Sequence, residues 1–465
     1  MYFSQLLLRC STVLALFFLM AACSSSKEVN EVSGSFNLDE LQRRTFNYFW
    51  DLADSTNYQI PDRYPKRTFT SIAATGFGLA AYIVGVEKHY VEREEAAQRV
   101  LNTLKVLYDL PQGMEVSGMG GYKGFFYHFL TYENATRYKN VELSTIDTGL
   151  LMAGVLGVQS FFDQDNEVEN EIRQLADDLY RRVEWNWMLS EEGLISMGWK
   201  PESGKLKHSY KGYSEAMILY VLALGSPTHA IGAEMWLNWT STYPWETFQS
   251  ETFVNYSPLF THQYSHMFID FRNIKDEYMT DKGIDYFENS RRATLANKNY
   301  CLENPANAAG YGEHCWGLTA CDGPGYLETT INGNPWTFHG YAARGASAIY
   351  TRDDGTIAPT AAGGSVPFAP EICIPALEYM WETYYEDLVG DYGFKDAFNL
   401  TWEDPDTGEN GWFDNDYLGI DQGPILIQIE NYRSGIIWDT MKKNPYIRQG
   451  LKRAGFTGGW LDRIE

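Results

Sequence analysis

The sequence predicts an all-α fold of the (α/α)6-barrel type, a toroid in which long loops form an active-site cleft at one end. About a dozen segments carry helical patterns, enough for an inner and an outer ring of helices. Segments 71–85, 144–160 and 214–224 are almost wholly apolar, whereas 91–109 and 167–183 carry charge on one face. This alternation of fully buried and half-exposed helices is what two concentric rings require. No repeat of the tetratricopeptide kind is visible, which disfavours a helical solenoid.

The expected helix starts follow local capping signals. Serine or aspartate precedes several of the apolar runs, as N-caps do, and Pro370 occupies the first-turn position that proline favours. The glycines within SIAATGFGLAAYIVG indicate close helix packing rather than nucleotide binding. Helices are expected to start near Asp39, Ser71, Val91, Ser144, Glu167, Ser214, Ala230, Pro258, Gly283, Gly340, Pro370 and Glu430.

Residues 1–22 are expected to be a bacterial lipoprotein signal rather than part of the fold. Arg9 is followed by an apolar run and by two alanines before Cys23, the residue that would carry lipid at the mature N-terminus. The alternatives are an ordinary signal peptide or a short membrane helix, but the run is too short to span a bilayer comfortably. We expect a signal at 1–22, a polar tether at 23–37 and a single catalytic domain at 38–465, exported as a periplasmic or outer-membrane lipoprotein.

The composition limits the class of partner. The formal net charge is −24 at pH 7, which disfavours nucleic acid and polyanionic substrates by repulsion. A neutral partner meets no such repulsion, and the aromatic content of 15% supplies rings on which apolar sugar faces can stack. We expect a neutral glycan as partner, no nucleic acid, and a monomeric chain.

Four cysteines remain once Cys10 leaves with the signal and Cys23 takes lipid. In an exported chain they can form up to two disulfides, in any of three pairings, or remain buried free thiols. Their spacing is not a zinc pattern. The four are Cys301, Cys315, Cys321 and Cys373.

Two acidic residues stand at the starts of separate apolar helices. Asp147 lies in VELSTIDTGLLMAGVL and Glu215 in GYSEAMILYVLALG, each after a serine that can cap the helix. Carboxylates at the same end of buried helices would converge on one rim, where they can act as acid and base. The alternative is structural, because Ser144 and Asp147 also match a capping box. Glu215 is the first candidate for catalysis and Asp147 the second.

Further side chains are candidates for binding the substrate. Several are acids in Gly-rich loops, where a base could lie, although a loop acid more commonly satisfies turn backbone. The histidines can equally be core residues, and the tryptophan can equally anchor its loop. The candidates are Glu142, His128, Trp199, His262, His266, Asp322, Glu371, Asp421 and Glu430.

The sequence indicates neither a metal site nor a cofactor. His262 and His266 are four residues apart and would share a helix face, but no HExxH glutamate lies between them and no third ligand is evident. Hydrogen bonding to sugar hydroxyls or to buried partners is the favoured role for both. A phosphate loop, a GxSxG elbow and a dinucleotide fingerprint are all absent from the sequence.

Taken together, several segments resemble the bacterial glucoamylase-like domain, which includes the β-1,2-glucanases of glycoside hydrolase family 144 and occurs within cyclic β-1,2-glucan synthases. The resemblance runs from about Leu38 to the C-terminus. The segments that carry it are RTFNYFWDLAD, SIAATGFGLAAYIVGVE, GYKGFFYHFL, VELSTIDTGLLMAGVL, RRVEWNWM, GYSEAMILYVLALGSPTH and THQYSHMFIDFR.

This resemblance implies an (α/α)6 barrel, an inverting mechanism without a metal, and β-1,2-linked glucan or its oligosaccharides as substrate. The family's general acid matches Glu215, and an aspartate essential to the family is matched to Asp147. The base is not assigned by any motif. Some members cut internally and others release sophorose from the non-reducing end, a difference that lies in loop shape.

Two other classes of protein compete with this interpretation. A glycan-binding surface lipoprotein that delivers oligosaccharides to a transporter shares the anchor and the aromatic residues, but it does not need paired acids at buried helix starts. A polysaccharide lyase on the same barrel would act on uronates, which the acidic surface disfavours.

Overall fold

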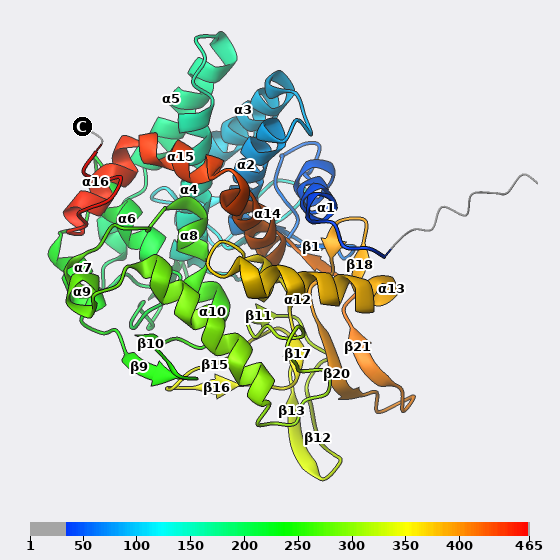
Figure 1. Ribbon diagram of the computed structural model, residues 1–465. Coiled ribbons are helices and arrows are strands. Elements are labelled where there is room, and N and C mark those ends of the chain that lie inside the picture. Colours follow the sequence, from blue (N-terminus) through cyan, green and yellow to red (C-terminus); the bar gives the residue numbers. More distant parts are fainter. Residues whose placement is uncertain (1–33, 464–465) are drawn as a thin grey trace, which may run out of the picture. The chain divides into compact units, whose positions relative to one another are not determined.

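The apolar and amphipathic segments form helices in the computed structural model, which describes residues 34–463 (Figure 1). The predicted signal and Cys23, the predicted site of lipid attachment, lie outside the described residues. The helices are α1 (Leu38–Asp51), α2 (Ile72–Glu87), α3 (Arg93–Asp109), α4 (Thr145–Phe161), α5 (Glu167–Arg181), α6 (Met217–Gly225), α7 (Glu234–Thr240), α8 (Tyr264–Phe268), α9 (Glu277–Lys282), α10 (Tyr286–Glu303), α11 (Pro359–Gly363), α12 (Pro370–Thr383), α13 (Tyr385–Leu388), α14 (Gly419–Arg433), α15 (Ile436–Lys443) and α16 (Pro445–Arg453), with 3₁₀ turns η1 (Trp185–Met188) and η2 (Leu259–His262).

Many short antiparallel strands connect these helices, so the predicted all-α class is too narrow. The long Gly-rich loops satisfy their backbone groups by pairing with one another, which a helical pattern does not reveal. The pairs are β1 (Arg63–Tyr64) with β22 (Tyr417–Leu418), β2 (Thr70–Ser71) with β5 (Phe129–Leu130), β3 (Gly121–Tyr122) with β4 (Phe125–Phe126), β9 (Trp245–Phe248) with β10 (Glu251–Val254), β11 (Ala320–Cys321) with β14 (Ala342–Ala343), β12 (Leu327–Ile331) with β13 (Asn334–Phe338), β15 (Gly345–Ala346) with β16 (Thr351–Arg352), and β18 (Val389–Gly390) with β19 (Gly393–Phe394). Two sheets have three strands: β6 (Leu143–Ser144), β7 (Gly198–Lys200) and β8 (Gly204–Lys205), and β17 (Thr356–Ile357), β20 (Phe398–Glu403) and β21 (Asn410–Phe413).

The helices differ in burial as their sequence patterns predict. Nearly every residue of α2, α4, α6 and α14 is buried, whereas α3 and α5 bury one face only. Helix α2 packs against both α4 and α14, and α4 packs against α6. The most buried helices therefore lie at the centre and the amphipathic ones cover them (Figure 1). No helix among residues 34–463 is long and apolar enough to cross a bilayer.

Two predicted helix starts are wrong. Residues after Gly340 form β14 and β15 instead of a helix, and Glu430 lies near the end of α14 rather than at a start. The α14 pattern is hidden in the sequence because Pro424 interrupts it. The predicted N1 proline of α12, Pro370, is confirmed.

The crossing of α2 and α4 depends on glycines that let the two backbones touch. A Cβ atom added to Gly154 would lie 2.2 Å from the carbonyl oxygen of Gly76, and one added to Gly76 would lie 2.5 Å from that of Leu150. Neither neighbour is a flexible side chain that could move aside. The predicted close packing of the glycines in SIAATGFGLAAYIVG is therefore confirmed for Gly76, and Gly154 of α4 is its partner in the contact.

Gly154→Ala should destabilise the domain by about 1–3 kcal/mol, because the new methyl group must push one helix backbone away from the other. The matched control is Gly157→Ala in the same helix, whose Cβ would meet only side-chain atoms at 3.5 Å or more. The control should be neutral or stabilising, since alanine favours helix over glycine. Urea unfolding followed by circular dichroism measures both variants. Equal free energies of unfolding for the two would contradict the backbone contact.

Candidate active site

Asp147 is held at the start of α4 by the cap that the sequence predicts. The side chain of Ser144 accepts a hydrogen bond from the Asp147 backbone N–H at 3.3 Å, and its hydroxyl donates to Oδ2 of Asp147. Strand β6 carries Ser144 and is paired with β7 at Gly198, so the cap is built into a small sheet. The Asp147 side chain is largely buried but lines a pocket.

Glu215 lies in the turn just before α6, rather than within the first turn of the helix as predicted. The helix begins at Met217, and Ser214 accepts from Ala216 N–H instead of forming the N-cap. Burial raises the pKa of Glu215 to about 7, against a hydrogen bond from its own backbone and with help from the negative charge of Asp147. The Glu215 side chain remains partly exposed, and a pKa near 7 keeps its carboxyl group protonated in a large fraction of molecules near neutral pH.

His128 joins two of the predicted acids. Its Nδ1 lies 2.8 Å from Oε1 of Glu142, and its Nε2 lies 3.6 Å from Oδ2 of Asp147. Burial lowers the pKa of His128, but the charge of Asp147 and the hydrogen bond to Glu142 outweigh it and raise the pKa to about 9. The hydrogen bond from His128 lowers the pKa of Glu142 to about 2. At neutral pH the imidazolium of His128 therefore lies between the carboxylate of Glu142 and the side chain of Asp147.

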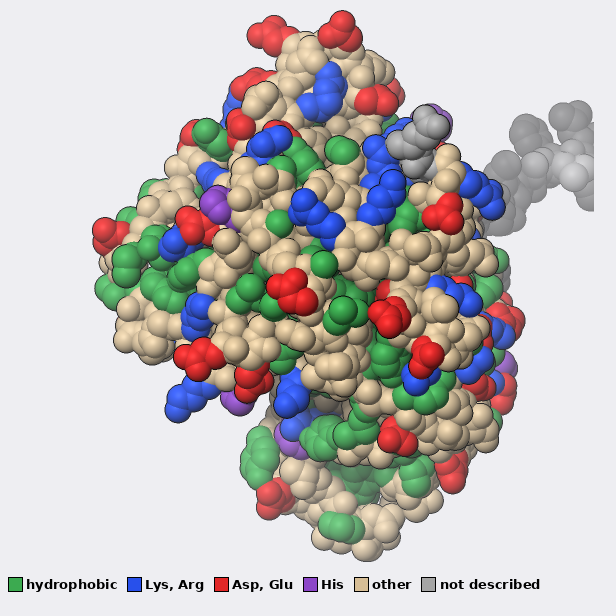
Figure 2. Space-filling view, turned by 90° about the vertical axis from the view of Figure 1, so that its left-hand side faces the viewer, with side chains coloured by type: hydrophobic (Ala, Val, Ile, Leu, Met, Phe, Trp, Pro, Cys, Tyr) green, Lys and Arg blue, Asp and Glu red, His purple; other side chains and the backbone are tan. Residues whose placement is uncertain are grey.

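Two pockets open beside these acids. One of about 230 Å³ is lined by Asp147 and His128 and by the exposed ring of Tyr341. The other, of about 570 Å³, is lined by Tyr256, whose pKa is raised by burial and by the negative charge of Glu215. Ala343 of β14 lines the second pocket, and Tyr341 just before the strand lines the first, so this short stretch of chain contributes to both. Figure 2 shows one face of the domain, which mixes acidic and basic side chains and is hollowed between the main body and the lower projection.

A guanidinium group closes the smaller pocket. Arg63 contacts Asp322 through Nη1 at 2.6 Å and Asp62 through Nε at 3.2 Å, and both Arg63 and Asp62 line the pocket. Strand β1 brings Arg63 here by pairing with β22, in register with Leu418. The predicted candidate Asp322 is thus brought to the edge of the site. Asp421, in the first turn of α14, is almost completely buried behind it, and burial raises its pKa to about 7.

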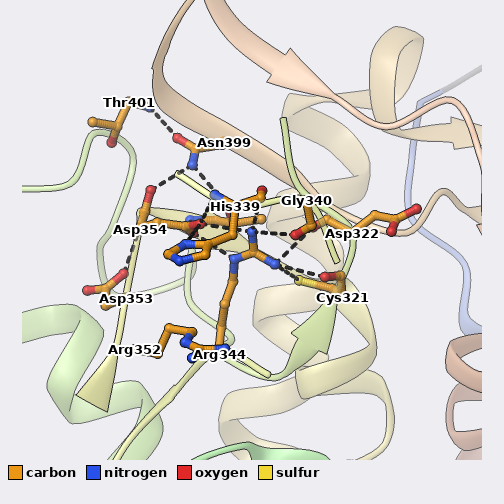
Figure 3. A network of polar contacts seen from close by, with 12 residues as sticks. Cys321, Asp322, His339, Gly340, Arg344, Arg352, Asp353, Asp354, Asn399 and Thr401 are labelled. Atoms are coloured by element: carbon orange, nitrogen blue, oxygen red, sulfur yellow. Dashed lines mark hydrogen bonds and ion pairs between the residues drawn. The ribbon is translucent and has the colours of Figure 1, made fainter. Parts of the chain in front are cut away.

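A buried arginine holds the loop that presents Asp322. Figure 3 shows the guanidinium of Arg344 between the carboxylate of Asp354 and the carbonyls of Cys321 and His339, with the Asp322 carboxyl pointing away from it. The bonds to Asp354 measure 2.7 and 2.8 Å, and the bond to Cys321 O measures 2.8 Å. Charge-assisted bonds of this kind order a Gly-rich segment that has little side-chain packing of its own.

Three aromatic candidates are buried structural residues, which corrects their predicted role in binding. Trp199 packs its ring on Tyr122 at 5.2 Å and is almost completely buried. His262 stacks on Tyr213 at 4.7 Å, and His266 hydrogen-bonds Ser290 at 3.0 Å. Burial lowers the pKa of both histidines to about 3, so they are neutral core residues. None of the three lines either pocket.

Two acidic candidates also lie away from the site. Glu371 is at the exposed start of α12 and pairs with Arg291 at 2.6 Å. Glu430 is nine residues after Asp421 on α14, about 14 Å along the helix, where it accepts a hydrogen bond from Gln42. Both acids were predicted from their residue type and their position in a loop. Neither property indicates which end of a helix lies near the pockets.

The four cysteines of the described chain are free and buried, so the free-thiol alternative is correct and no disulfide forms among them. Sequence reasoning missed other residues that the fold brings to the site, namely Asp62, Arg63, Tyr256, Tyr341, Asp396, Asp414 and Asp416. The acid-dense stretch FDNDYLGID before α14 is the one local signal that could have found part of this set.

Comparison with known proteins places these observations in a family. A model of the family described as "putative glucoamylase" matches residues 207–445. The crystal structure of a "putative glucoamylase" from Bacteroides uniformis is 34% identical, with a TM-score of 0.77 over 91% of this chain and 99% of that one. The chain therefore belongs to the glucoamylase-like family, as the resemblance predicts.

Two further relatives have stated activities. An endo-β-1,2-glucanase from Chitinophaga pinensis, solved with sophorotriose and glucose, is 28% identical, with a TM-score of 0.76 over 91% of this chain and 99% of that one. An exo-β-1,2-glucooligosaccharide sophorohydrolase (non-reducing end) from Parabacteroides distasonis is 29% identical over 90% of this chain. The chain spans 57% of the length of that sophorohydrolase.

Glu142→Gln should lower the pKa of His128 by about 1–2 units, because the substitution removes a charge-assisted hydrogen bond worth about 1.5–3 kcal/mol. NMR titration of the His128 ring, assigned from the signal lost in His128→Gln, measures the change. Glu202→Gln is the control, since Glu202 pairs with Arg137 rather than with His128. An unchanged His128 titration in Glu142→Gln would show that the contact does not form in solution.

Proposed function

We propose that this protein is an inverting glycoside hydrolase that cleaves β-1,2-glucan or β-1,2-glucooligosaccharides. The observation that carries the proposal is the partly exposed Glu215, whose burial raises the pKa to about 7 beside a second carboxyl group, Asp147. A carboxylic acid that keeps its proton near neutral pH suits the general acid of a glycosidase. The stated activities of the Chitinophaga and Parabacteroides relatives support the β-1,2-linkage.

Glu215 and Asp147 take different roles because their surroundings differ. No basic side chain within the described range 34–463 forms an ion pair with Glu215, which donates its proton to the leaving glycosidic oxygen. Asp147 has the imidazolium of His128 and the hydroxyl of Ser144 beside it, and both stabilise its negative charge. It therefore serves as the base that takes a proton from the attacking water. Asp421, the competing candidate, is buried and has a raised pKa, which makes it a weaker choice.

The two pockets provide binding sites near the two acids: Asp147 lines the smaller one, and Tyr256, which lines the larger one, feels the charge of Glu215. The smaller pocket offers carboxylate and guanidinium groups from Asp62, Arg63 and Asp147, which can hydrogen-bond sugar hydroxyls. The larger pocket offers the exposed rings of Tyr256 and Tyr350, on which a sugar face can stack. We assign the smaller pocket, which has charged groups in its lining, to the non-reducing end. Exo-type release of sophorose is proposed because it is the activity stated for the Parabacteroides relative.

The arrangement of the helices is proposed to be the (α/α)6 barrel of the prediction. Helices α2, α4, α6, α8, α11 and α14 would form the inner ring. In support, each packs on a neighbour in this set, and the side chain of Gln263 at the start of α8 donates to Ala361 O of α11 at 2.9 Å. The pockets and the acids before α4, α6 and α14 would then share one mouth of the barrel.

The location of the protein in the cell is inferred from the sequence alone. We infer a periplasmic or outer-membrane lipoprotein anchored through Cys23, supported by the signal pattern at 1–22. The anchored protein acts as a monomer on neutral glucan, with no resident cofactor.

Incubation with β-1,2-glucooligosaccharides should release sophorose, and the first-formed product should carry the inverted α-anomer in ¹H NMR. Glucans of other linkage serve as controls and should stay intact. A β-anomeric first product would contradict inversion. Binding without any shorter chain would favour a glycan-delivering lipoprotein, and products that absorb ultraviolet light would indicate a lyase.

Glu215→Gln should reduce kcat by about 10²–10⁴-fold while oligosaccharide binding persists, because only the transferable proton is lost. In the wild type, the rate should fall as the pH rises through about 7, since Glu215 is active when protonated. Glu191→Gln, in an exposed loop, is the matched control and should keep normal turnover. Near-normal hydrolysis by Glu215→Gln would remove this residue from the acid role.

A further inference from the structure

A second group of carboxylates meets near the smaller pocket, at one end of the β20–β21 hairpin. Asp396 lies just before β20 and Asp414 just after β21, where Phe398 pairs with Phe413. The backbone N–H of Asp414 donates to Ala397 O at 2.9 Å, which fixes the two ends side by side. Asp322, which follows β11, completes a three-aspartate cluster.

The three-aspartate cluster has the spacing of a cation site. One carboxylate oxygen from each of Asp322, Asp396 and Asp414 lies within 4.8 Å of the others. Oxygen ligands bind calcium at about 2.3–2.6 Å, so two ligands of one ion can be no more than about 5 Å apart. The loop geometry thus brings three hard oxygen ligands to the distance that a single ion spans.

Unpartnered buried oxygens point to a missing ligand. Oδ1 of Asp396 and Oδ2 of Asp414 are buried and have no hydrogen-bond partner, although the residues are only 2% and 7% exposed. Oδ2 of Asp421 is likewise buried without a hydrogen-bond partner. Buried carboxylate oxygens are rarely left without a donor or a metal ion.

The basic side chains nearby do not balance the negative charge of Asp396, Asp414 and Asp421. Arg63 and Lys66 form ion pairs with Asp62, Asp322 and Asp416. Among residues 34–463, no lysine, arginine or histidine forms an ion pair with Asp396, Asp414 or Asp421. Arg63 contacts Oδ2 of Asp322, which leaves Oδ1 for another ligand.

We propose that Asp322, Asp396 and Asp414 bind one divalent cation of the hard, oxygen-preferring class, with calcium as the best fit. No histidine or cysteine belongs to the cluster, which disfavours zinc and copper. Calcium accepts irregular sets of carboxylates and completes its shell with water, whereas magnesium requires a near-ideal octahedron. This ion is structural and takes no part in the proposed acid–base chemistry.

The ion would tie together parts of the chain that are far apart in sequence. It would join the loop after β11 to the end of the β20–β21 hairpin. Arg63, which contacts Asp322 in that loop, lines the smaller pocket. The proposal concerns the cluster alone and stands independently of the proposed glycosidase activity.

The test uses the whole mature protein after dialysis against EDTA and then against chelator-free buffer. Adding calcium chloride should raise Tm by several degrees in a saturable way, because a ligand that binds only the folded state stabilises it by mass action. Equilibrium dialysis with metal analysis should find about one calcium ion per chain. Magnesium chloride at the same concentration should give a smaller shift.

Asp414→Asn should abolish both calcium retention and the calcium-dependent rise in Tm. The matched control is Asp406→Asn, in the exposed turn at the other end of the same hairpin, which should behave as the wild type. If Asp414→Asn fails to fold, Asp322→Asn, at the partly exposed member, gives the same comparison. Absence of bound calcium and of any Tm shift in the wild type would overturn the proposal, as would full calcium binding by the folded variant.

Discussion

The site depends on one constraint, which is that a helix buried on every side can offer polar groups only at its ends. Helices α2, α4, α6 and α14 have almost no exposed side chains, so their N-terminal ends are where the chain can place carboxyl groups. The backbone N–H groups at such an end lack partners within the helix and favour negative charge. Asp147 and Asp421 occupy first turns of this kind, and Glu215 lies just before another. The glycine crossing of α2 and α4 brings two of these ends close enough to form a common rim.

Burying several carboxyl groups together creates a charge that the protein neutralises in different ways. Beside Asp147 the neutralising group is the imidazolium of His128, and in the smaller pocket it is the guanidinium of Arg63. Glu215 has no cation and keeps a proton instead. The division between acid and base roles follows from these surroundings, because a carboxyl group next to a cation ionises more readily than one next to another carboxylate.

The loops decide what the common scaffold can bind. The relatives share the fold along nearly the whole described chain, yet their stated activities include both internal cleavage and release from the non-reducing end. In this protein Arg344 and Asp354 order the loop that carries Asp322, and Tyr341 and Ala343 line the smaller and the larger pocket. These segments have little apolar core of their own and depend on buried polar contacts, so small changes there can reshape the pockets while the helices stay in place.

The sequence by itself determined the buried helices, the Ser144–Asp147 cap and the close packing at a glycine of α2, because each rests on a local pattern of a few residues. The tertiary structure alone decided which other groups meet these acids. Arg63 reaches the smaller pocket, and Asp414 reaches Asp322 and Asp396, through strand pairs and turns far apart in the chain, and no local pattern records such pairing. Conversely, Trp199 and His262 have the composition of binding residues but pack into the core. Whether an aromatic ring or an acid faces a pocket or the interior depends on the face and end of its element, which only packing against distant segments determines.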